Sequence, residues 1–507
     1  MIIVQLFFAL IFGACVTYSL APYDYQWLTP LSPAGLYLLL KFTHRPALIG
    51  WFFGLGLFGT GVSWVYVSIS EHSSTPTPVG VGIVAAMVAI LALLYAIQAK
   101  LSHLFIRCSV RGALGFIGLW VLGEWLRSWF LTGFPWLYIG NAAIDTVLAD
   151  WVPVGGVWLS SFMFASLGVG TLLLLEILSS YRFIPRLVAL TLVTTPWLII
   201  FIPVEQPVSQ SPVSLDTLIV QADIPQADKW DPDQLTSILG RYQTMSESYE
   251  GEAPDLIVWP ETAISAFART ALPILGSYLS SLDRQDITLV SGIPSARFNR
   301  DHNEVEYFNS LAVMSTGSDI YHKQRLVPVG EYIPFERELR GITDFFNLPM
   351  SSFSLPAQQS GQLRVKDQHL AAAICYEIAY PALVRQAAID SSAIITVSND
   401  TWFGKSIAPA QHMQIAQMRA LENGRWVIRS TNNGITGVID DKGNIVAEAP
   451  RFQQATLRYS IPMMQGETLY QRWGDLPVLL LAFSFVLIGA TTLLYHPNYH
   501  RRIWDDE

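Results

Sequence analysis

Three side chains that together could carry out covalent chemistry lie beside short apolar runs. Glu261 follows the run 256–260, Lys323 precedes the run 326–330, and Cys375 follows the run 370–374. A thiol is mostly protonated at neutral pH, so it needs a nearby base, and Glu261 could accept its proton. The ammonium of Lys323, with backbone N–H groups near Cys375, could hold the negative charge of a tetrahedral intermediate. Lys323 would also lower the pKa of the thiol. The set therefore fits acyl transfer through a cysteine.

Each of these residues also has an ordinary structural interpretation. Free cysteines are among the most buried residues and often act as small hydrophobic groups. A glutamate directly after a proline often begins a helix, where the helix dipole stabilises its charge. A single lysine is usually a solvated surface charge. Only the combination of the three favours catalysis.

The elements that must position these residues lie within 204–476. The run 370–374 is too short to span a membrane and is typical of a buried strand. A nucleophile directly after such a strand is held rigidly at the edge of a sheet. Strands are predicted at 217–221, 255–259, 287–292, 311–314, 370–374, 393–397, 426–429 and 437–440, and helices at 232–249 and 411–423. This alternation predicts a layered α/β domain, joined through a Pro-rich linker at 203–212.

The composition indicates a membrane protein with a substantial soluble part. The 507 residues are 51% hydrophobic and only 14% charged, whereas soluble proteins carry about 25% charged residues. The net charge is −9 and no basic face is evident, so nucleic acid is not an expected partner. Of the three cysteines, Cys15 and Cys108 fall in or beside apolar segments. The soluble part therefore has one thiol, a candidate reactive group.

Eight apolar segments are candidate membrane spans, most of them near the ~20 residues that a span needs. The first has no preceding Lys or Arg and is interpreted as a retained span rather than a cleaved signal. The second is short and contains Pro30 and Pro33. The segments are 1–20, 25–41, 47–69, 80–105, 112–131, 155–180, 184–203 and 477–495.

The charges of the loops predict an orientation. With the N-terminus inside, the short outer loops contain only acidic charges, at Asp24, Glu71, Asp145 and Asp150. The inner loops contain Lys41, Arg45, Lys100, Arg107, Arg111, Arg182, Arg186, Arg501 and Arg502. This agrees with the positive-inside rule and places 204–476 outside the cytoplasm.

The motifs around the three residues resemble those of a known family. Trp-Pro-Glu-Thr at 259–262, Tyr-His-Lys at 321–323 and Cys-Tyr-Glu at 375–377 are similar to the Glu-Lys-Cys triad of the nitrilase, or carbon–nitrogen hydrolase, superfamily. With seven spans before and one after, nearly the whole chain resembles the apolipoprotein N-acyltransferase family of Gram-negative bacteria. Val329 stands where that family has an aromatic residue. Further similar stretches are 58–67, 131–136, 220–226, 229–231, 326–331, 348–353, 398–404 and 430–434.

The resemblance implies a role for each site residue. Glu261 would be the base, Lys323 would stabilise the intermediate, and Cys375 would carry the acyl group as a thioester. Other residues would support the site or meet the substrates: Glu331, Tyr376 and Glu377 beside the triad, Asn309 in the pocket, Trp230 on a mobile loop over the entrance, and Trp136 in a membrane-side arm beneath it.

The resemblance also implies the substrates. A phospholipid, typically phosphatidylethanolamine, would give its sn-1 acyl chain to the cysteine, and the α-amino group of a diacylglyceryl-cysteine on an apolipoprotein would then take it. Both substrates lie in the bilayer, and an apolar mouth would keep water from the thioester. No cofactor is implied.

The resulting expectation for the fold is an eight-span α-helical bundle that carries a nitrilase-like αββα sandwich. Residues 1–204 would form seven spans, and 205–476 the catalytic domain in the periplasm. Residues 477–507 would form the last span and a cytoplasmic tail, in the bacterial inner membrane.

Several alternatives remain open. Glu124 and Arg127, at i,i+3 within a span, are either a functional site or a structural pair that neutralises itself. Trp402 and Phe403 could line an acyl channel or only pack. The histidines lack metal-ligand spacing, so no metal is expected. A membrane-tethered amidase would use the same triad but gives no reason for the spans, and a transporter would need functional charges in several spans.

Overall fold

The computed structural model describes residues 2–72, 75–106, 109–177, 183–201, 204–300, 303–314, 319–328, 330–332, 353–357 and 361–495. The chain divides into two compact units. The first comprises Met1–Tyr66, Pro76–Glu205 and Trp473–Glu507, and the second comprises Val67–Thr75 and Gln206–Arg472.

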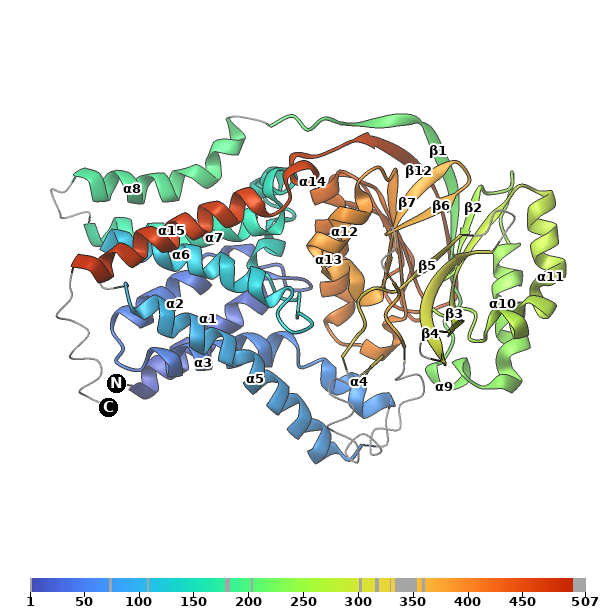
Figure 1. The fold of residues 1–507 in the computed structure, drawn as a ribbon, viewed down its shortest axis with the longest axis horizontal. Coiled ribbons are helices and arrows are strands. Elements are labelled where there is room, and N and C mark those ends of the chain that lie inside the picture. Colours follow the sequence, from blue (N-terminus) through green and yellow to red (C-terminus); the bar gives the residue numbers. More distant parts are fainter. Residues whose placement is uncertain are drawn as a thin grey trace. The chain divides into compact units, whose positions relative to one another are not determined.

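The first unit is a bundle of apolar helices (Figure 1). Extensive contacts join α1 (Ile2–Ser19) to α3 (Pro46–Gly61), α3 to α5 (Thr77–His103), and α6 (Ser109–Arg127) to α15 (Leu476–Tyr495). Glycine makes one close crossing possible, because a Cβ on Gly13 would lie 2.0 Å from the Phe53 carbonyl oxygen. The other elements are α2 (Leu31–Lys41), α7 (Val152–Ile177), α8 (Phe183–Thr194) and 3-10 turns at Gln26–Leu28, Ile139–Ala143, Val147–Trp151 and Thr195–Ile200. Helix α4 (Val65–His72) begins in this unit, and its residues from Val67 onward belong to the second.

Several of these helices are able to span a membrane. Within the described residues, five are long and apolar enough, and a sixth is added if Pro46–Gly61 and Val65–Glu71, bent by 51°, form one span. The predicted count of eight is not confirmed. The segment 25–41 forms only the 11-residue α2, and α6, which contains most of the predicted span 112–131, is not among the helices apolar enough to cross. The five are Ile2–Ser19, Thr77–His103, Val147–Ile177, Phe183–Ile200 and Leu476–Leu493.

The second unit contains two six-stranded sheets, ordered β12-β1-β2-β3-β4-β5 and β11-β10-β9-β8-β7-β6. Three central strands of each sheet, β1–β2–β3 and β7–β8–β9, run parallel, and the outer strands pair antiparallel. The strands are β1 (Val208–Gln221), β2 (Leu256–Val258), β3 (Thr288–Asn299), β4 (Glu304–Val313), β5 (Ile320–His322), β6 (Gln362–Val365), β7 (Gln368–Ile374), β8 (Ala393–Ser398), β9 (Val427–Thr431), β10 (Gly437–Ile439), β11 (Ile445–Glu448) and β12 (Ala455–Gly466).

The two sheets face each other across one apolar core, to which β2 contributes Val258, β7 Ile374 and β8 Ile395. Helices α10 (Leu235–Ser246) and α11 (Ala268–Arg284) cover the outer face of the first sheet, and α12 (Pro381–Ala388) and α13 (Ala408–Asn423) cover that of the second (Figure 1). The second unit is therefore an αββα sandwich. Because both faces of the central strands are covered, these strands are continuously apolar, which is why they were recognisable in the sequence.

The second unit differs from the expectation in its edges. The stretch 203–212 was predicted to be a linker, but Val208 already begins β1 and pairs with Gly466 of β12. Pro212 is tolerated because it lies where the register of this pairing shifts, between Gln210 and Ser214. The shorter elements are α9 (Gln226–Lys229), α14 (Leu469–Trp473) and 3-10 turns at Pro232–Gln234, Cys375–Ala379 and Asp400–Phe403.

Candidate active site

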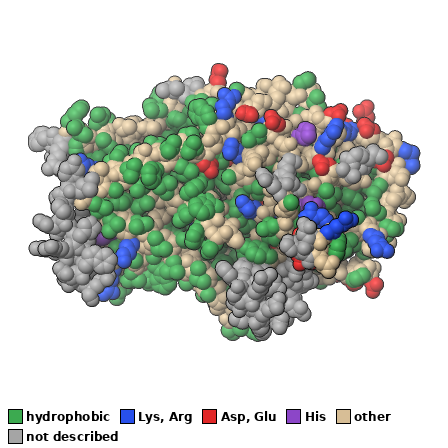
Figure 2. Space-filling view, viewed as in Figure 1, with side chains coloured by type: hydrophobic (Ala, Val, Ile, Leu, Met, Phe, Trp, Pro, Cys, Tyr) green, Lys and Arg blue, Asp and Glu red, His purple; other side chains and the backbone are tan. Residues whose placement is uncertain are grey.

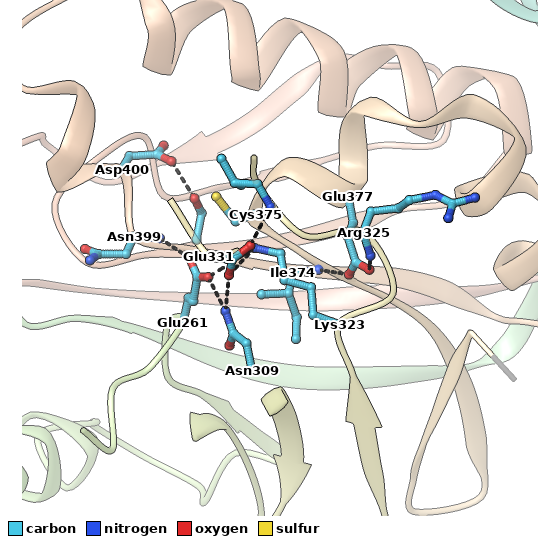
Figure 3. Close-up of polar contacts among 12 residues, drawn as sticks. Glu261, Asn309, Lys323, Arg325, Glu331, Ile374, Cys375, Glu377, Asn399 and Asp400 are labelled. Carbon is cyan, nitrogen blue, oxygen red and sulfur yellow. Dashed lines mark hydrogen bonds and ion pairs between the residues drawn. The ribbon is translucent and has the colours of Figure 1, made fainter. Parts of the chain in front are cut away.

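The second unit brings the three predicted catalytic residues together (Figure 3). Glu261 lies just beyond β2, and Lys323 and Cys375 directly follow β5 and β7. Because these strands belong to the two facing sheets, their ends converge. The Lys323 Nζ is 3.6 Å from Glu261 Oε1, and the charges of both residues act on the Cys375 thiol.

Two carboxylates, the buried Glu261 and the partly buried Glu331, share their partners at this point. Asn309 Nδ2 donates to Glu261 Oε1 at 2.8 Å and to Glu331 Oε1 at 2.9 Å. Lys323 Nζ donates to Glu331 Oε1 at 2.9 Å. The second oxygen of Glu261 accepts from the backbone N–H of Asn399 at 2.8 Å. Both oxygens of the Glu261 carboxylate are thus held in place by hydrogen bonds. A general base needs such a fixed orientation toward the proton that it accepts.

Lys323 is a permanent cation in this site. Its side chain is only 1% exposed. Burial alone would lower the pKa of Lys323, but the charges of Glu331 and Glu261 outweigh burial and raise it well above its usual value. A fixed positive charge in a water-poor site is well suited to stabilising an oxyanion.

Cys375 is held in a strained turn. Its φ is +53°, in the left-handed region that non-glycine residues rarely adopt. Burial and the charge of Glu261 raise the pKa of the thiol, and Lys323 lowers it by less. The expected effect of Lys323, a lowering of the thiol pKa, is confirmed, but burial and the charge of Glu261 outweigh it and the net shift is upward. The thiol is protonated at neutral pH, and its reaction needs a base.

Glu377 connects the turn of Cys375 to the segment after Lys323. Its Oε2 accepts from the Ile374 N–H at 2.8 Å and from the Tyr321 hydroxyl at 2.9 Å. Its Oε1 accepts from the backbone N–H groups of Gln324 and Arg325, at 2.5 and 3.0 Å. Burial raises the pKa of Glu377 to about 7 in spite of these bonds. Glu377 thus connects β7, which precedes Cys375, with β5 and the segment after Lys323.

A buried network behind Cys375 was not predicted from the sequence. His412 Nε2–H donates to the Cys375 carbonyl oxygen at 3.1 Å, and Arg429 Nη2 donates to Asp400 Oδ2 at 2.9 Å and to His412 Nδ1 at 3.0 Å. Burial would raise the pKa of Asp400, but the charge of Arg429 holds it well below its usual value. The one feature of the sequence that could have indicated this network is the run of three polar residues, 398–400, at the end of a buried strand.

Relatives match the chain along nearly its whole length. An apolipoprotein N-acyltransferase of Pseudomonas paraeruginosa is 41% identical over 506 residues, which cover 97% of this chain and 97% of the relative. The chain belongs to the apolipoprotein N-acyltransferase family. Members from Azotobacter vinelandii and Vibrio parahaemolyticus are 40% and 38% identical, over 96% and 94% of this chain and 94% and 95% of their own.

Two family models match separate parts of this chain. The apolipoprotein N-acyltransferase N-terminal domain matches residues 12–170, and the carbon–nitrogen hydrolase model matches residues 219–469. The protein is therefore an acyltransferase of the nitrilase superfamily. An amidase from a Nesterenkonia species covers 53% of this chain and 97% of its own at 16% identity and a TM-score of 0.36. A carbon–nitrogen hydrolase from Helicobacter pylori covers 52% and 94% at 14% identity and a TM-score of 0.34.

The remaining predicted residues of the second unit lie as follows. Trp230 directly follows α9 and is half-buried. The half-buried ring of Tyr376 packs edge-on against Tyr380, with the ring centres 5.2 Å apart. Trp402 and Phe403 are half-buried, and the Ser68 hydroxyl donates to the Trp402 carbonyl oxygen at 2.7 Å. None of these contacts tests a role in binding or gating, so those roles stay predictions.

In the first unit, Glu124 and Arg127 are buried but form no direct salt bridge within the described residues. Arg127 donates to the carbonyl oxygens of Trp136 and Leu137, and Glu124 accepts from the Ile139 N–H at 3.1 Å. The two side chains thus hold one irregular segment, 136–139, without bonding directly to each other, which favours the structural interpretation. Trp136 is 1% exposed, and its ring centre lies 5.5 Å from that of Trp64.

No group of three or more His, Cys, Asp or Glu side chains that could hold a metal ion occurs in the part of the chain that the structure describes. The expectation of a metal-free site stays a prediction.

Proposed function

We propose that Cys375 accepts an acyl chain from a phospholipid as a thioester and passes it to the amino group of a lipidated apolipoprotein. The observation that carries this proposal is a buried cation, Lys323, placed between two fixed carboxylates beside a thiol with a raised pKa. This arrangement supplies a base, an oxyanion stabiliser and a nucleophile in one water-poor site.

In the first step, Glu261 takes the thiol proton as the sulfur attacks the ester carbonyl carbon of the phospholipid. Lys323 stabilises the oxyanion of the tetrahedral intermediate. When the intermediate collapses, the carbon–oxygen bond breaks and Glu261 returns the proton to the departing lysophospholipid oxygen. The products are a Cys375 thioester and a lysophospholipid.

In the second step, the α-amino group of a diacylglyceryl-cysteine attacks the thioester carbonyl. Glu261 takes a proton from the amine, Lys323 again stabilises the oxyanion, and the carbon–sulfur bond breaks. Glu261 then returns its proton to the sulfur. The products are the amide and the free thiol of Cys375.

The substrates account for the apolar unit. The proposed donor is phosphatidylethanolamine, and both substrates carry acyl chains that reside in a bilayer. We place the protein in the bacterial inner membrane with eight spans, residues 1–204 and 477–507 forming the membrane parts and 205–476 the periplasmic catalytic domain. Helices long and apolar enough to cross a bilayer and the absence of Lys and Arg from the short outer loops support this placement. Trp230 would cover the entrance, with Trp136 beneath it, and Asn309, Trp402 and Phe403 would meet the substrates.

Purified protein incubated with a labelled phospholipid should become acylated at Cys375, as detected by peptide mass spectrometry. Addition of a diacylglyceryl peptide should then discharge the label into the peptide. Cys375→Ser should abolish both signals, whereas Cys15→Ser, which removes another free thiol, should change neither. Substantial transfer by Cys375→Ser would remove Cys375 from the role of nucleophile, and release of free fatty acid without peptide product would favour a hydrolase.

The orientation needs a separate experiment. Asp367 is exposed, with 95% of its side-chain surface accessible, so Asp367→Cys introduces a reachable thiol into the second unit. A membrane-impermeant thiol reagent should label this variant in intact spheroplasts, and a reporter fused after Glu507 should be active only in the cytoplasm. Protection of the new thiol until the cells are lysed would refute the periplasmic placement.

A further inference from the structure

The segment 224–230, which ends at Trp230, is attached to the site at three successive points. The side-chain amide of Asn432 binds the backbone of Ile224 twice. Its Oδ1 accepts from the Ile224 N–H at 3.0 Å, and its Nδ2 donates to the Ile224 carbonyl oxygen at 2.7 Å. Gln226 Oε1 accepts from the Asn399 side chain at 2.8 Å. Lys229 Nζ donates to the carbonyl oxygen of Glu261 at 2.9 Å. The proposed reaction uses none of these side chains directly.

Two of the three attachments converge on Glu261. Asn399 donates its backbone N–H to Glu261 Oε2, at 2.8 Å, while its side-chain amide donates to Gln226. Gln226 therefore orients the residue that holds the carboxylate of Glu261. Lys229 holds the backbone of the same glutamate. The base is thus attached to this segment through both its main chain and its side chain.

The burial of Lys229 shows that this attachment is not an ordinary loop contact. The residue is only 3% exposed, although a buried ammonium is costly unless it is compensated. Burial lowers the pKa of Lys229 to about 8, and the nearby charge of Glu261 limits the decrease. The neighbouring Asp228 is exposed, as is usual for a charged residue in a short helix.

We propose that Lys229 and Gln226 are positioning residues that latch the segment 224–230, and Trp230 with it, to the base Glu261. When the segment is docked, it holds Glu261 where its charge acts on the Cys375 thiol. A lipid substrate that packs against Trp230 would then favour the same arrangement that activates the thiol. This inference rests on the proposed role of Glu261 as the base.

The latch is tested with Lys229→Met and Gln226→Met, which keep the length of each side chain and remove its hydrogen bond. Asp228→Asn serves as the matched control. Two rates are measured on the full-length protein: alkylation of Cys375 by iodoacetamide and thioester formation from phosphatidylethanolamine. We expect both rates to fall about tenfold or more in Lys229→Met and several-fold in Gln226→Met, because a misplacement of about 1 Å can cost ~10²-fold. The control should match the wild type, and Gln226→Glu, which keeps the acceptor oxygen, should retain more activity than Gln226→Met.

A double variant separates positioning from general loss of structure. In a Glu261→Gln background, Lys229→Met should cause no further decrease in either rate, because the latch acts only through Glu261. A further decrease of the same size as in the wild-type background would overturn the proposal. If Lys229→Met does not fold, Gln226→Met in the same two backgrounds decides. If the latch variants react at the wild-type rate while Glu261→Gln reacts slowly, the latch is refuted and the role of Glu261 as base stands. If Glu261→Gln itself reacts at the wild-type rate, the role of Glu261 as base is refuted as well.

Discussion

The two proposed roles of Lys323, charge balance and stabilisation of the intermediate, can be tested separately, because the carboxylates of Glu261 and Glu331 both lie beside it. In Lys323→Met, the buried oxygens Glu261 Oε1 and Glu331 Oε1 would remain within 2.8 and 2.9 Å of the same Asn309 nitrogen. Two carboxylates this close cannot both stay ionised, so one must take up a proton. Breaking a buried ion pair in this way typically costs about 3–5 kcal/mol of stability.

A second substitution restores the charge balance without restoring the cation. Lys323→Met combined with Glu331→Gln leaves Glu261 as the single buried carboxylate of this group. We expect the double variant to regain most of the lost stability. The rate of thioester formation should stay roughly 10²–10³-fold below wild type, the usual loss when one oxyanion donor is removed.

The two roles are read out by different measurements on the same preparations. Thermal unfolding midpoints in one detergent report stability, and rapid-quench mass spectrometry of Cys375 reports thioester formation. Glu331→Gln alone, which keeps the cation, is the control. If thioester formation returns together with stability in the double variant, Lys323 only balances charge, and the assignment of the oxyanion to it is refuted.

Other predictions concern single groups. Glu261→Gln should slow thioester formation by roughly 10²-fold or more, the scale of losing a general base, and a wild-type rate would make Glu261 structural. Trp230→Ala should leave alkylation of Cys375 by a small reagent near wild type while impairing turnover of full-size lipid, whereas equal losses in both would argue against gating. Alkylation of Cys375 should keep rising with pH beyond the usual thiol pKa of about 8.5, since its pKa is raised; a plateau reached below pH 8 would contradict this. The pKa of Glu377 is raised to about 7 in the folded protein, so its contribution to stability is present at low pH and is lost as the pH rises through about 7. The unfolding midpoint should therefore carry a component that declines over this range and disappears in Glu377→Gln.

The three candidate residues and most of the central strands of the two sheets could be recognised in the sequence, because both leave local signals. A strand buried on both faces is a short apolar run, and Cys375 stands directly after one. β5 has only three residues, and β11 is largely exposed, so neither produces such a run. Helix α11 contains Pro273, which interrupts the usual helical pattern.

The contacts that tune the site could not be predicted, because they join residues far apart in the sequence. Glu261 and Asn399 are separated by 138 positions, and only the pairing of the two sheets brings them together. The net direction of the Cys375 pKa shift could not be predicted either, although the lowering by Lys323 was. The sequence shows which charges are present, but not how completely the thiol is removed from water, and burial is the larger effect here.

The raised pKa of Cys375 has a consequence for the order of events in the proposed reaction. A permanently ionised thiolate would react with any electrophile that reached it, whereas a protonated thiol reacts only when Glu261 can take its proton as a carbonyl carbon arrives. Each unit of raised pKa adds about 1.4 kcal/mol to the cost of forming the thiolate. The same removal from water that imposes this cost also slows hydrolysis of the thioester. A slower formation of the thiolate is thus accompanied by a longer-lived thioester. In the proposed reaction the second substrate, a lipidated amine, must reach the site by diffusion in a bilayer, so the acyl group has to survive until the acceptor arrives.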